Sequence, residues 1–349
     1  MAITWMVSVG LCTLVAVGRP ANASAQNADP GLGQYLARMG ISAKEHEAAA
    51  RGRAVAKLLP TTDNRDVAVI GIIGVNVLRS AAVAHVLDIE RFLAASGTRA
   101  HRFATPPSPD DVREAAFAND EYRGLRHCRR GDCDFKLPAS AMKGFVEQVD
   151  WSARDAKAQA DARLRDDLLR LVADYTTRGN EAMPTYDDGH GVRAADAFGA
   201  LLAQSSDFYT HVPELHHYLT SYPANRPDGA RDLLYWSEDR LPRLRPTLTV
   251  SHVVAYALPA GASADALVAR KQIYASHYFE GALELLAVVG TDGASREPGA
   301  YLLTVRRFRF DHLPGGLLNI RGRVRRQMVD ATRADLERQR SSMQQATVP

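Results

Sequence analysis

Apolar and polar residues alternate most regularly between Thr247 and Asp311. In a β-strand successive side chains point to opposite faces, so a period of two is typical of strands that bury one face. Turn-forming residues at 259–264 and 291–299 interrupt the alternation. The pattern predicts consecutive strands at Thr247–Leu258, Arg270–Phe279, Leu283–Val289 and Tyr301–Phe310.

Three further elements are predicted before this stretch. Asp66–Val77 is an almost continuous apolar run, which favours a buried strand. It contains a G-x-x-G spacing, but no glycine-rich turn of the kind found in a dinucleotide-binding site follows it. Ala81–Ala94 follows Ser80 and places its apolar residues on one face, which predicts a helix. Residues 26–65 are predicted to be an N-terminal helical segment, because 26–60 is rich in alanine and leucine.

Residues 139–246 have a mainly helical pattern. The clearest helix begins at Ser152-x-x-Asp155, carries one apolar stripe and ends at Gly179. Because the strand pattern resumes only at Thr247, we interpret this segment as a large helical insertion. Its other predicted helices are Ala194–Gln204, Pro213–Leu219 and Ala230–Leu241.

A long C-terminal helix is predicted at Leu317–Ser341. Its polar face carries several arginines together with Asp330, Asp335 and Glu337, which is typical of a solvated face with intrahelical ion pairs. We therefore predict no nucleic-acid partner. Peripheral contact with an anionic membrane surface is the alternative interpretation of the arginines.

The composition excludes several classes of protein. The 349 residues are 46% hydrophobic and 24% charged, which is enough for one or two folded domains and excludes a largely disordered chain. The formal net charge of +3 does not indicate a nucleic-acid partner. No cofactor is predicted. The segment His211-x-x-Glu214-x-His216-His217 lacks the H-E-x-x-H spacing, so no metal is predicted either.

The first residues predict export. Ile3–Val17 is an apolar run about as long as the core of a signal peptide, and Ala23-Ser24-Ala25 is a small-residue cleavage signal. We predict a signal peptide at 1–25 and a periplasmic or secreted protein without a transmembrane segment after cleavage. An uncleaved anchor or a misassigned start is the alternative, since the leader has no basic residue before the apolar run.

The cysteine content agrees with this prediction. Cys128 and Cys133 are separated by four residues that include glycine and aspartate, so they can close a tight disulfide loop in an oxidising compartment. A two-thiolate metal or redox pair is the alternative. It lacks a second cysteine or histidine pair at zinc spacing.

The order of elements resembles the helix-grip fold of the START and polyketide-cyclase-like (SRPBCC) superfamily. Val67–Val77 and the helix after Leu78-Arg79-Ser80 resemble the opening strand and first helix of that family. The strands from Thr247 to Phe310 resemble its antiparallel sheet, and Leu313-Pro314-Gly315-Gly316 with the last helix resembles its closing element.

The resemblance implies an α+β fold with a curved antiparallel sheet and a long C-terminal helix that enclose an apolar cavity. The two parts of this START-like domain would be 66–138 and 247–343. Cys128–Cys133, Lys271–Phe279 and Arg309–Leu313 are also similar to stretches of uncharacterised exported bacterial proteins, which implies no activity.

Candidate ligand-binding residues lie on the predicted strands. In Thr247–Leu258 the bulkier face includes His252 and Tyr256, and we expect that face to point into the core or cavity. His252 would contact the polar end of a ligand, or it would be a core histidine hydrogen-bonded to a neighbour.

The next strands add four candidates. Tyr274 and Tyr278 share one face of the predicted strand and His277 lies on the other, but alternation does not say which face is inside. These residues would line a ligand pocket, or they would be part of ordinary aromatic packing between strands. Arg307 belongs to a group of arginines that could bind a carboxylate or phosphate, or could form ion pairs at a solvated edge.

The function that these observations favour is binding of a lipid or other apolar small molecule. One alternative is a hydrolase or cyclase on the same scaffold, with His252 or His277 as general base. The other is an envelope-associated protein whose insertion binds a partner.

Overall fold

The computed structural model describes residues 31–118, 121–189, 191–206, 210–239, 245–290, 299–311 and 320–346. The predicted signal peptide and the turn at 313–316 lie outside these residues. No helix in the described ranges is both long and apolar enough to cross a membrane.

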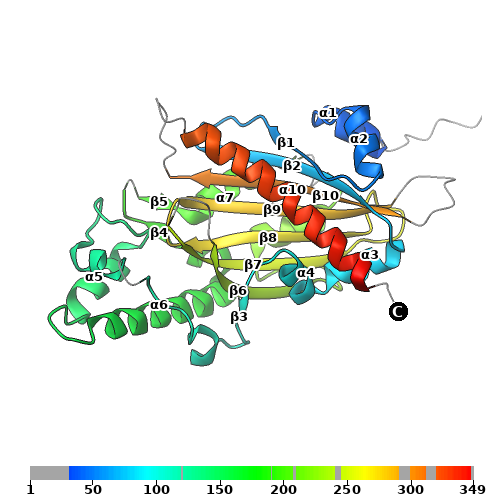
Figure 1. The fold of residues 1–349 in the computed structure, drawn as a ribbon. Helices are drawn as coiled ribbons and strands as arrows, with labels where there is room; N and C mark the ends of the chain where they lie inside the picture. Colours follow the sequence, from blue (N-terminus) through cyan, green and yellow to red (C-terminus); the bar gives the residue numbers. More distant parts are fainter. Residues whose placement is uncertain are drawn as a thin grey trace, which may run out of the picture.

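One large antiparallel sheet forms the centre of the molecule (Figure 1). In the described part of the chain it has eight strands in the order β1-β2-β10-β9-β8-β7-β6-β3. The strands are β1 (Val55–Leu59), β2 (Asp66–Val75), β3 (His101–Arg102), β6 (Arg231–Asp239), β7 (Thr247–Ala257), β8 (Ala266–Ala275), β9 (Phe279–Gly290) and β10 (Ala300–Phe310). A separate hairpin pairs β4 (Thr185–Tyr186) with β5 (Val192–Arg193). The predicted α+β class with an antiparallel sheet and a long last helix is confirmed.

One face of the sheet is covered by α10 (Ile320–Ala346), which crosses the strands diagonally, and by α3 (Arg79–Leu87) and α4 (Ile89–Ala95). The helix packs closely on Gly71 of β2, where a Cβ atom would lie 2.8 Å from Thr332 Cγ2 and 2.9 Å from Leu336 Cδ1. Gln339 of α10 is fully buried, and its Oε1 accepts a hydrogen bond from His85 Nε2 at 2.8 Å. These contacts hold α10 against both the sheet and α3.

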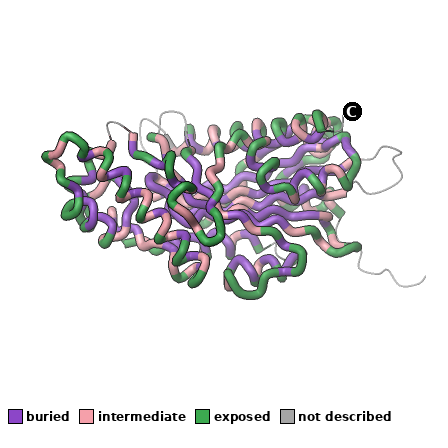
Figure 2. The backbone as a smooth tube through the Cα atoms, turned by 90° about the horizontal axis from the view of Figure 1, so that it is seen from below, coloured by how far each residue is buried: buried purple, intermediate pink, exposed green. Residues whose placement is uncertain are grey.

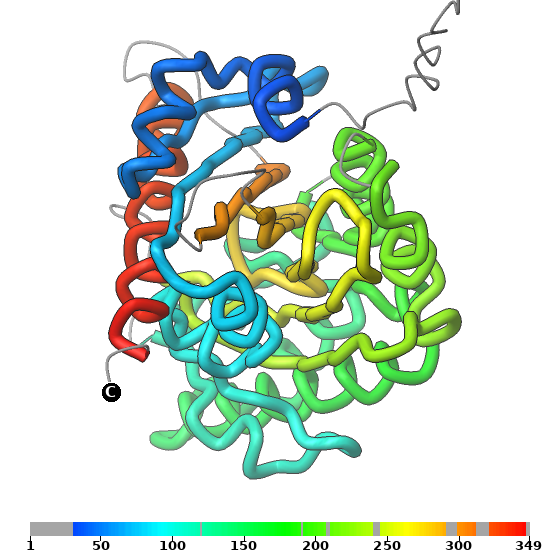
Figure 3. Tube along the Cα trace, turned by 90° about the vertical axis from the view of Figure 1, so that its right-hand side faces the viewer, coloured from blue at the N-terminus to red at the C-terminus, as the bar shows by residue number. Residues whose placement is uncertain are grey.

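The opposite face is covered by a second layer of helices (Figure 3). It comprises α5 (Ala139–Gln148), α6 (Ala156–Arg178), α7 (Ala194–Ala203) and α9 (Pro213–Ser221), while α1 (Leu32–Arg38) and α2 (Ala43–Ala50) lie near β2 and β10. Short 3-10 segments, η1 (Pro109–Val112), η2 (Tyr122–His127) and η3 (Gly179–Ala182), complete it. Because helices cover both faces, the central strands are buried on both sides (Figure 2).

Three secondary-structure predictions need correction. Ala230–Leu241 is not a helix: β6 pairs along β7 in the sheet, so the predicted insertion contributes one strand to the central sheet. Residues 26–65 are not helical throughout, because Gly52 takes a positive φ of 79° after α2 and the chain then forms edge strand β1. Ala81–Ala94 is two helices, divided at Asp88, whose side chain caps α4 by accepting from Arg91 N at 3.2 Å.

The predicted disulfide is confirmed: Cys128 and Cys133 are joined with an S–S distance of 2.07 Å. Replacing both cysteines with serine should lower the free energy of unfolding by about 2 kcal/mol, because so short a loop restricts the unfolded chain only modestly. Urea denaturation with and without reductant measures this. Reduction should destabilise the wild type equally and leave the Cys128→Ser/Cys133→Ser protein unchanged; an unchanged wild type would contradict the prediction.

Candidate functional site

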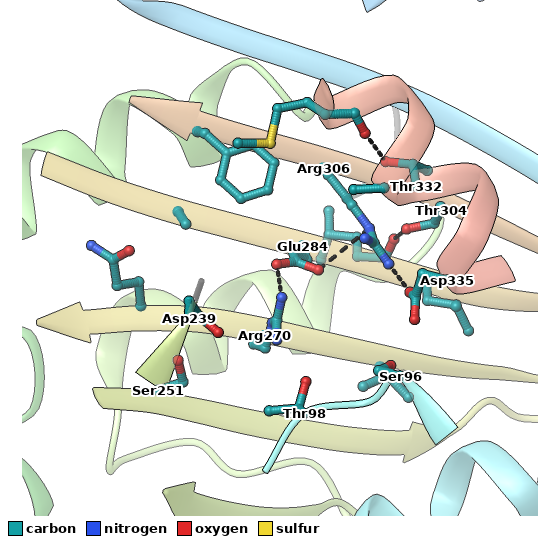
Figure 4. A pocket seen from close by; sticks show the side chains of 18 of the residues that line it. Ser96, Thr98, Asp239, Ser251, Arg270, Glu284, Thr304, Arg306, Thr332 and Asp335 are labelled. Atoms are coloured by element: carbon teal, nitrogen blue, oxygen red, sulfur yellow. Dashed lines mark hydrogen bonds and ion pairs between the residues drawn. The ribbon is translucent and has the colours of Figure 1, made fainter. Parts of the chain in front are cut away.

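A cavity of about 250 Å³ lies between the sheet and α10 (Figure 4). Its floor is formed by strands from β6 to β10, and Ser96 and Thr98, at and beyond the end of α4, line one side. The cavity is therefore where the C-terminal helix was expected to cover one. Its lining, however, is mixed: charged and hydroxyl-bearing side chains share it with apolar ones such as Phe279, Phe308 and Met328.

Four charged side chains run across the cavity from the sheet to the helix. Arg270 of β8 and Arg306 of β10 both contact the carboxylate of Glu284 on β9, with Arg306 Nε 3.4 Å from Glu284 Oε2. Arg306 also pairs with Asp335 of α10. Arg338 Nη2 lies 3.5 Å from Asp335 Oδ1 and extends the chain of charges to the surface.

Strand register brings the first three of these residues together. Arg270 and Arg306 are the direct cross-strand partners of Glu284 on its two sides. Opposite charges in such positions attract each other, which helps to fix the register of β8, β9 and β10. The arrangement follows from one residue on each strand and does not depend on a loop.

These charges are well shielded from water. Asp335 is 3% exposed, Glu284 and Arg306 are each 12% exposed, and Arg270 is 25% exposed. Burying charges costs several kcal/mol per ion unless each has partners. Within the described residues, Arg306 Nε and Asp335 Oδ1 make no hydrogen bond, since their ion-pair contacts are long or poorly aligned. Both atoms therefore keep unused hydrogen-bonding capacity.

Hydroxyl and carboxylate groups line the β6–β7 side. Thr249 Oγ1 donates to Asp239 Oδ2 at 3.1 Å, and Ser251 lies beside them on the same face of β7. Among the described lining residues, Arg270, Arg306 and Arg338 balance Asp239, Glu284 and Asp335 in charge. The cavity is thus rich in donors and acceptors and close to neutral overall.

The bulky face of β7 points into the core, which is one of its two expected settings, and not into the cavity beneath α10. The face toward α10 carries Thr249 and Ser251, whereas His252 and Tyr256 point to the other helix layer. The bulky face fills a core against the helices of residues 139–221, so bulk alone did not indicate the cavity. None of the six predicted ligand residues is among the described residues that line this cavity.

His252 belongs to a buried polar network on that other face. Its Nε2 lies 2.9 Å from Asp232 Oδ1 and its Nδ1 lies 2.9 Å from the Tyr175 hydroxyl. Lys271, its partner in the β7–β8 ladder, has Nζ 2.9 Å from the same hydroxyl and also contacts Asn180 Oδ1.

Burial decides the protonation of this network. It lowers the pKa of His252 and lowers that of Lys271 to about 7. The ammonium or amine of Lys271 donates to Tyr175, Tyr175 can then donate to His252 Nδ1, and His252 Nε2–H donates to Asp232. A general base must reach its substrate, and neither His252 nor Lys271 has exposed surface. The arrangement is a hydrogen-bonded core in this conformation.

The remaining predicted residues are dispersed. Tyr274 is buried against Tyr186, with ring centroids 6.2 Å apart, and Tyr256 is half-buried at the edge of the same core. Arg307 Nε donates to Ser205 Oγ at 2.8 Å, on the α7 side of the sheet. These contacts bring the three residues into the core and not into one site.

His277 and Tyr278 do not lie on a strand as predicted. They form the turn between β8 and β9, where Tyr278 has a positive φ of 60°. His277 Nδ1 lies 2.9 Å from the Asp134 carbonyl oxygen, and burial lowers its pKa to about 4. The Tyr278 hydroxyl accepts from Arg245 N at 3.0 Å.

The sequence contains one sign of the cavity that was missed. Glu284 interrupts the apolar run of Leu283–Val289, and a carboxylate within such a strand is expected to need a buried cationic partner. No group of three His, Cys, Asp or Glu side chains in the described ranges is placed to hold a metal ion.

Comparison with protein-family models gives no match for this chain. The comparisons with curated proteins and with solved structures give none either.

Proposed function

We propose that this protein binds a small, polar and overall uncharged molecule in the cavity beneath α10. The observation that carries the proposal is the chain of largely shielded charges, from Arg270 to Asp335, beside unfilled space. A helix that only packs on a sheet needs an apolar interface, because charged groups there cost free energy. A ligand that uses these groups accounts for their presence.

The lining also supports a ligand class. Because three arginines balance three carboxylates, a ligand with a net charge would leave one charge uncompensated in a partly dehydrated space. A zwitterion or a polyhydroxylated molecule matches the alternating donors and acceptors. The volume of about 250 Å³ lies just below that of pockets for drug-sized ligands, which favours a molecule of monosaccharide or amino-acid size.

This proposal changes the ligand expected from the sequence. A lipid or apolar molecule would place hydrocarbon against Glu284 and the two partly buried guanidinium groups without replacing their hydration. The proposed setting is the periplasm or the extracellular space, which the predicted leader and the disulfide favour. The relationship to the START-like superfamily also stays a proposal, which the antiparallel sheet and the last helix across it support in general form.

Ser251→Leu should abolish binding while keeping the fold. The side chain of Ser251 enters the cavity and no ion pair depends on it, so leucine fills the space without leaving an unpaired charge. Thermal unfolding in the presence of neutral monosaccharides and zwitterionic amino acids, followed by native mass spectrometry, identifies the ligand. A ligand at a hundred times its Kd should stabilise the wild type by about 2.7 kcal/mol.

The matched control is Ser80→Leu, the same chemical change at an exposed position in α3. It should bind like the wild type. If no polar solute stabilises the wild type, or if Ser251→Leu binds as well as Ser80→Leu, the proposed site is wrong.

A further inference from the structure

A second cavity, of about 300 Å³, lies on the opposite face of the sheet. Its floor is a row of directly paired residues on adjacent strands: Leu267 of β8, Ala287 of β9 and Leu303 of β10. Both leucines are buried, and the small alanine between them leaves the hollow. Val212, just before α9, and Val289 add apolar wall. Figure 3 shows the β7–β8 turn and the helices α1 and α2 at this end of the molecule.

Helix α1 closes one side of the cavity with a stripe of mixed character. Leu32, Tyr35 and Arg38 are spaced three residues apart, so they lie near one another on the helix surface and all three line the cavity. The Arg38 guanidinium lies 5.8 Å from the centre of the Tyr35 ring. The stripe therefore changes from apolar to cationic along α1.

The charges around the opening are positive on balance. Arg79 also lines the cavity but is paired with Asp265 through both guanidinium nitrogens that face it. Arg38 is exposed and has no ion pair in the described part of the chain. No carboxylate is present among the described lining residues. The cavity thus joins an apolar floor to one uncompensated cation.

We propose that this cavity binds a small amphipathic monoanion, an acyl or aryl carboxylate. Its apolar part lies on the Leu267–Ala287–Leu303 row, and its carboxylate lies toward Arg38, where a charge-assisted hydrogen bond with a guanidinium is strong and bidentate. A dry cavity of 150 Å³ holds benzene, so a space of this size admits about eight to twelve carbon atoms. The site is independent of the polar cavity beneath α10.

The test uses the full mature chain and three probes below their micellar concentrations: decanoate, decanol and decylamine. Isothermal titration calorimetry should show one decanoate site and weaker binding of decanol and decylamine. Ala287→Phe fills the hollow and should weaken decanoate at least about tenfold. Arg38→Glu, at an exposed position, should weaken decanoate about tenfold but decanol less than about twofold, because it reverses only the charge.

Ser251→Leu is the control that separates the two cavities. It should leave decanoate binding unchanged, so that failure of the polar site and failure of this site are distinguishable. Decanoate that binds Arg38→Glu as tightly as the wild type, or decanol that binds as tightly as decanoate, would overturn the assignment of an anion. If circular dichroism shows that Ala287→Phe does not fold, the Arg38→Glu result alone decides.

Discussion

Replacing Arg306 with methionine should lower the free energy of unfolding by about 3 kcal/mol. Arg306 pairs with Glu284 and with Asp335, and both acids are largely shielded from water. Removing the shared cation leaves each carboxylate with one partner, Arg270 or Arg338, so the loss should fall near the lower end of the range for broken buried ion pairs. Urea denaturation followed by circular dichroism gives the value.

Two further variants test whether the loss of stability is specific to the shielded ion pairs. Arg306→Met combined with Asp335→Leu should regain part of the lost stability, because the most buried carboxylate is then no longer uncompensated. Arg99→Met breaks an exposed pair with Glu114 and should cost less than about 1 kcal/mol. Equal losses at Arg306 and Arg99 would show that the charges beneath α10 are effectively solvated.

Stability should also rise with pH between 7 and 9, and Lys271→Met should remove that rise. Lys271 Nζ is buried 4.5 Å from the centre of the Phe198 ring, and burial lowers its pKa from 10.5 to about 7. Between these two values the unfolded chain holds a proton that the native protein has released. The free energy of unfolding therefore increases by up to about 1.4 kcal/mol per pH unit, and by about 2 kcal/mol from pH 7 to pH 9.

The pKa of Lys271 is lower in the native protein than in the unfolded chain. Its contribution to the free energy of unfolding is therefore fully present above pH 10.5 and is lost as the pH falls through 7. Burial also lowers the pKa of His252 and His277 from 6.5, so they are neutral in the native protein and mostly neutral in the unfolded chain across this window, and the raised pKa of Tyr175 keeps its hydroxyl protonated. Urea denaturation at pH 7, 8 and 9 measures the slope. Lys143→Met, at an exposed position, should keep it; a wild type without a slope would mean that Lys271 is hydrated.

Much of the sheet could be predicted from the sequence. The apolar runs that became β2, β7, β9 and β10 are long, and those of β2 and β7 are rich in β-branched residues, so their type was clear. The predicted ends of β8 and β9 differ from the observed ends by several residues. β6 was missed because its charged ends, Arg231 and Glu238, gave it a helix-like composition. Its buried Tyr235 and Trp236 are residues that favour strands.

The site could not be predicted in the same way. Alternation shows which residues share a face of a strand. It does not show which helix layer each face of β7 meets, because β7 is buried on both faces, and only the polarity of the side chains on each face distinguishes the two. The Arg270–Glu284 pairing depends on the register of β8 and β9, and the turn between them, 276–278, contains no glycine, proline or asparagine to mark it. Asp335 was interpreted as part of a solvated helix face, although it is buried against Arg306.

The position of β2 has a consequence for how the chain acquires its structure. Asp66 and Arg309, which pair across β2 and β10, are 243 residues apart in sequence. Contacts between such distant segments close a large loop, and proteins dominated by them fold slowly. Strands β1 and β2 are synthesised early but gain their central neighbour only when β10 has emerged. Until then the unpaired edge of β2 is open to wrong partners, so truncation before β10 should yield an aggregating chain and not a smaller domain.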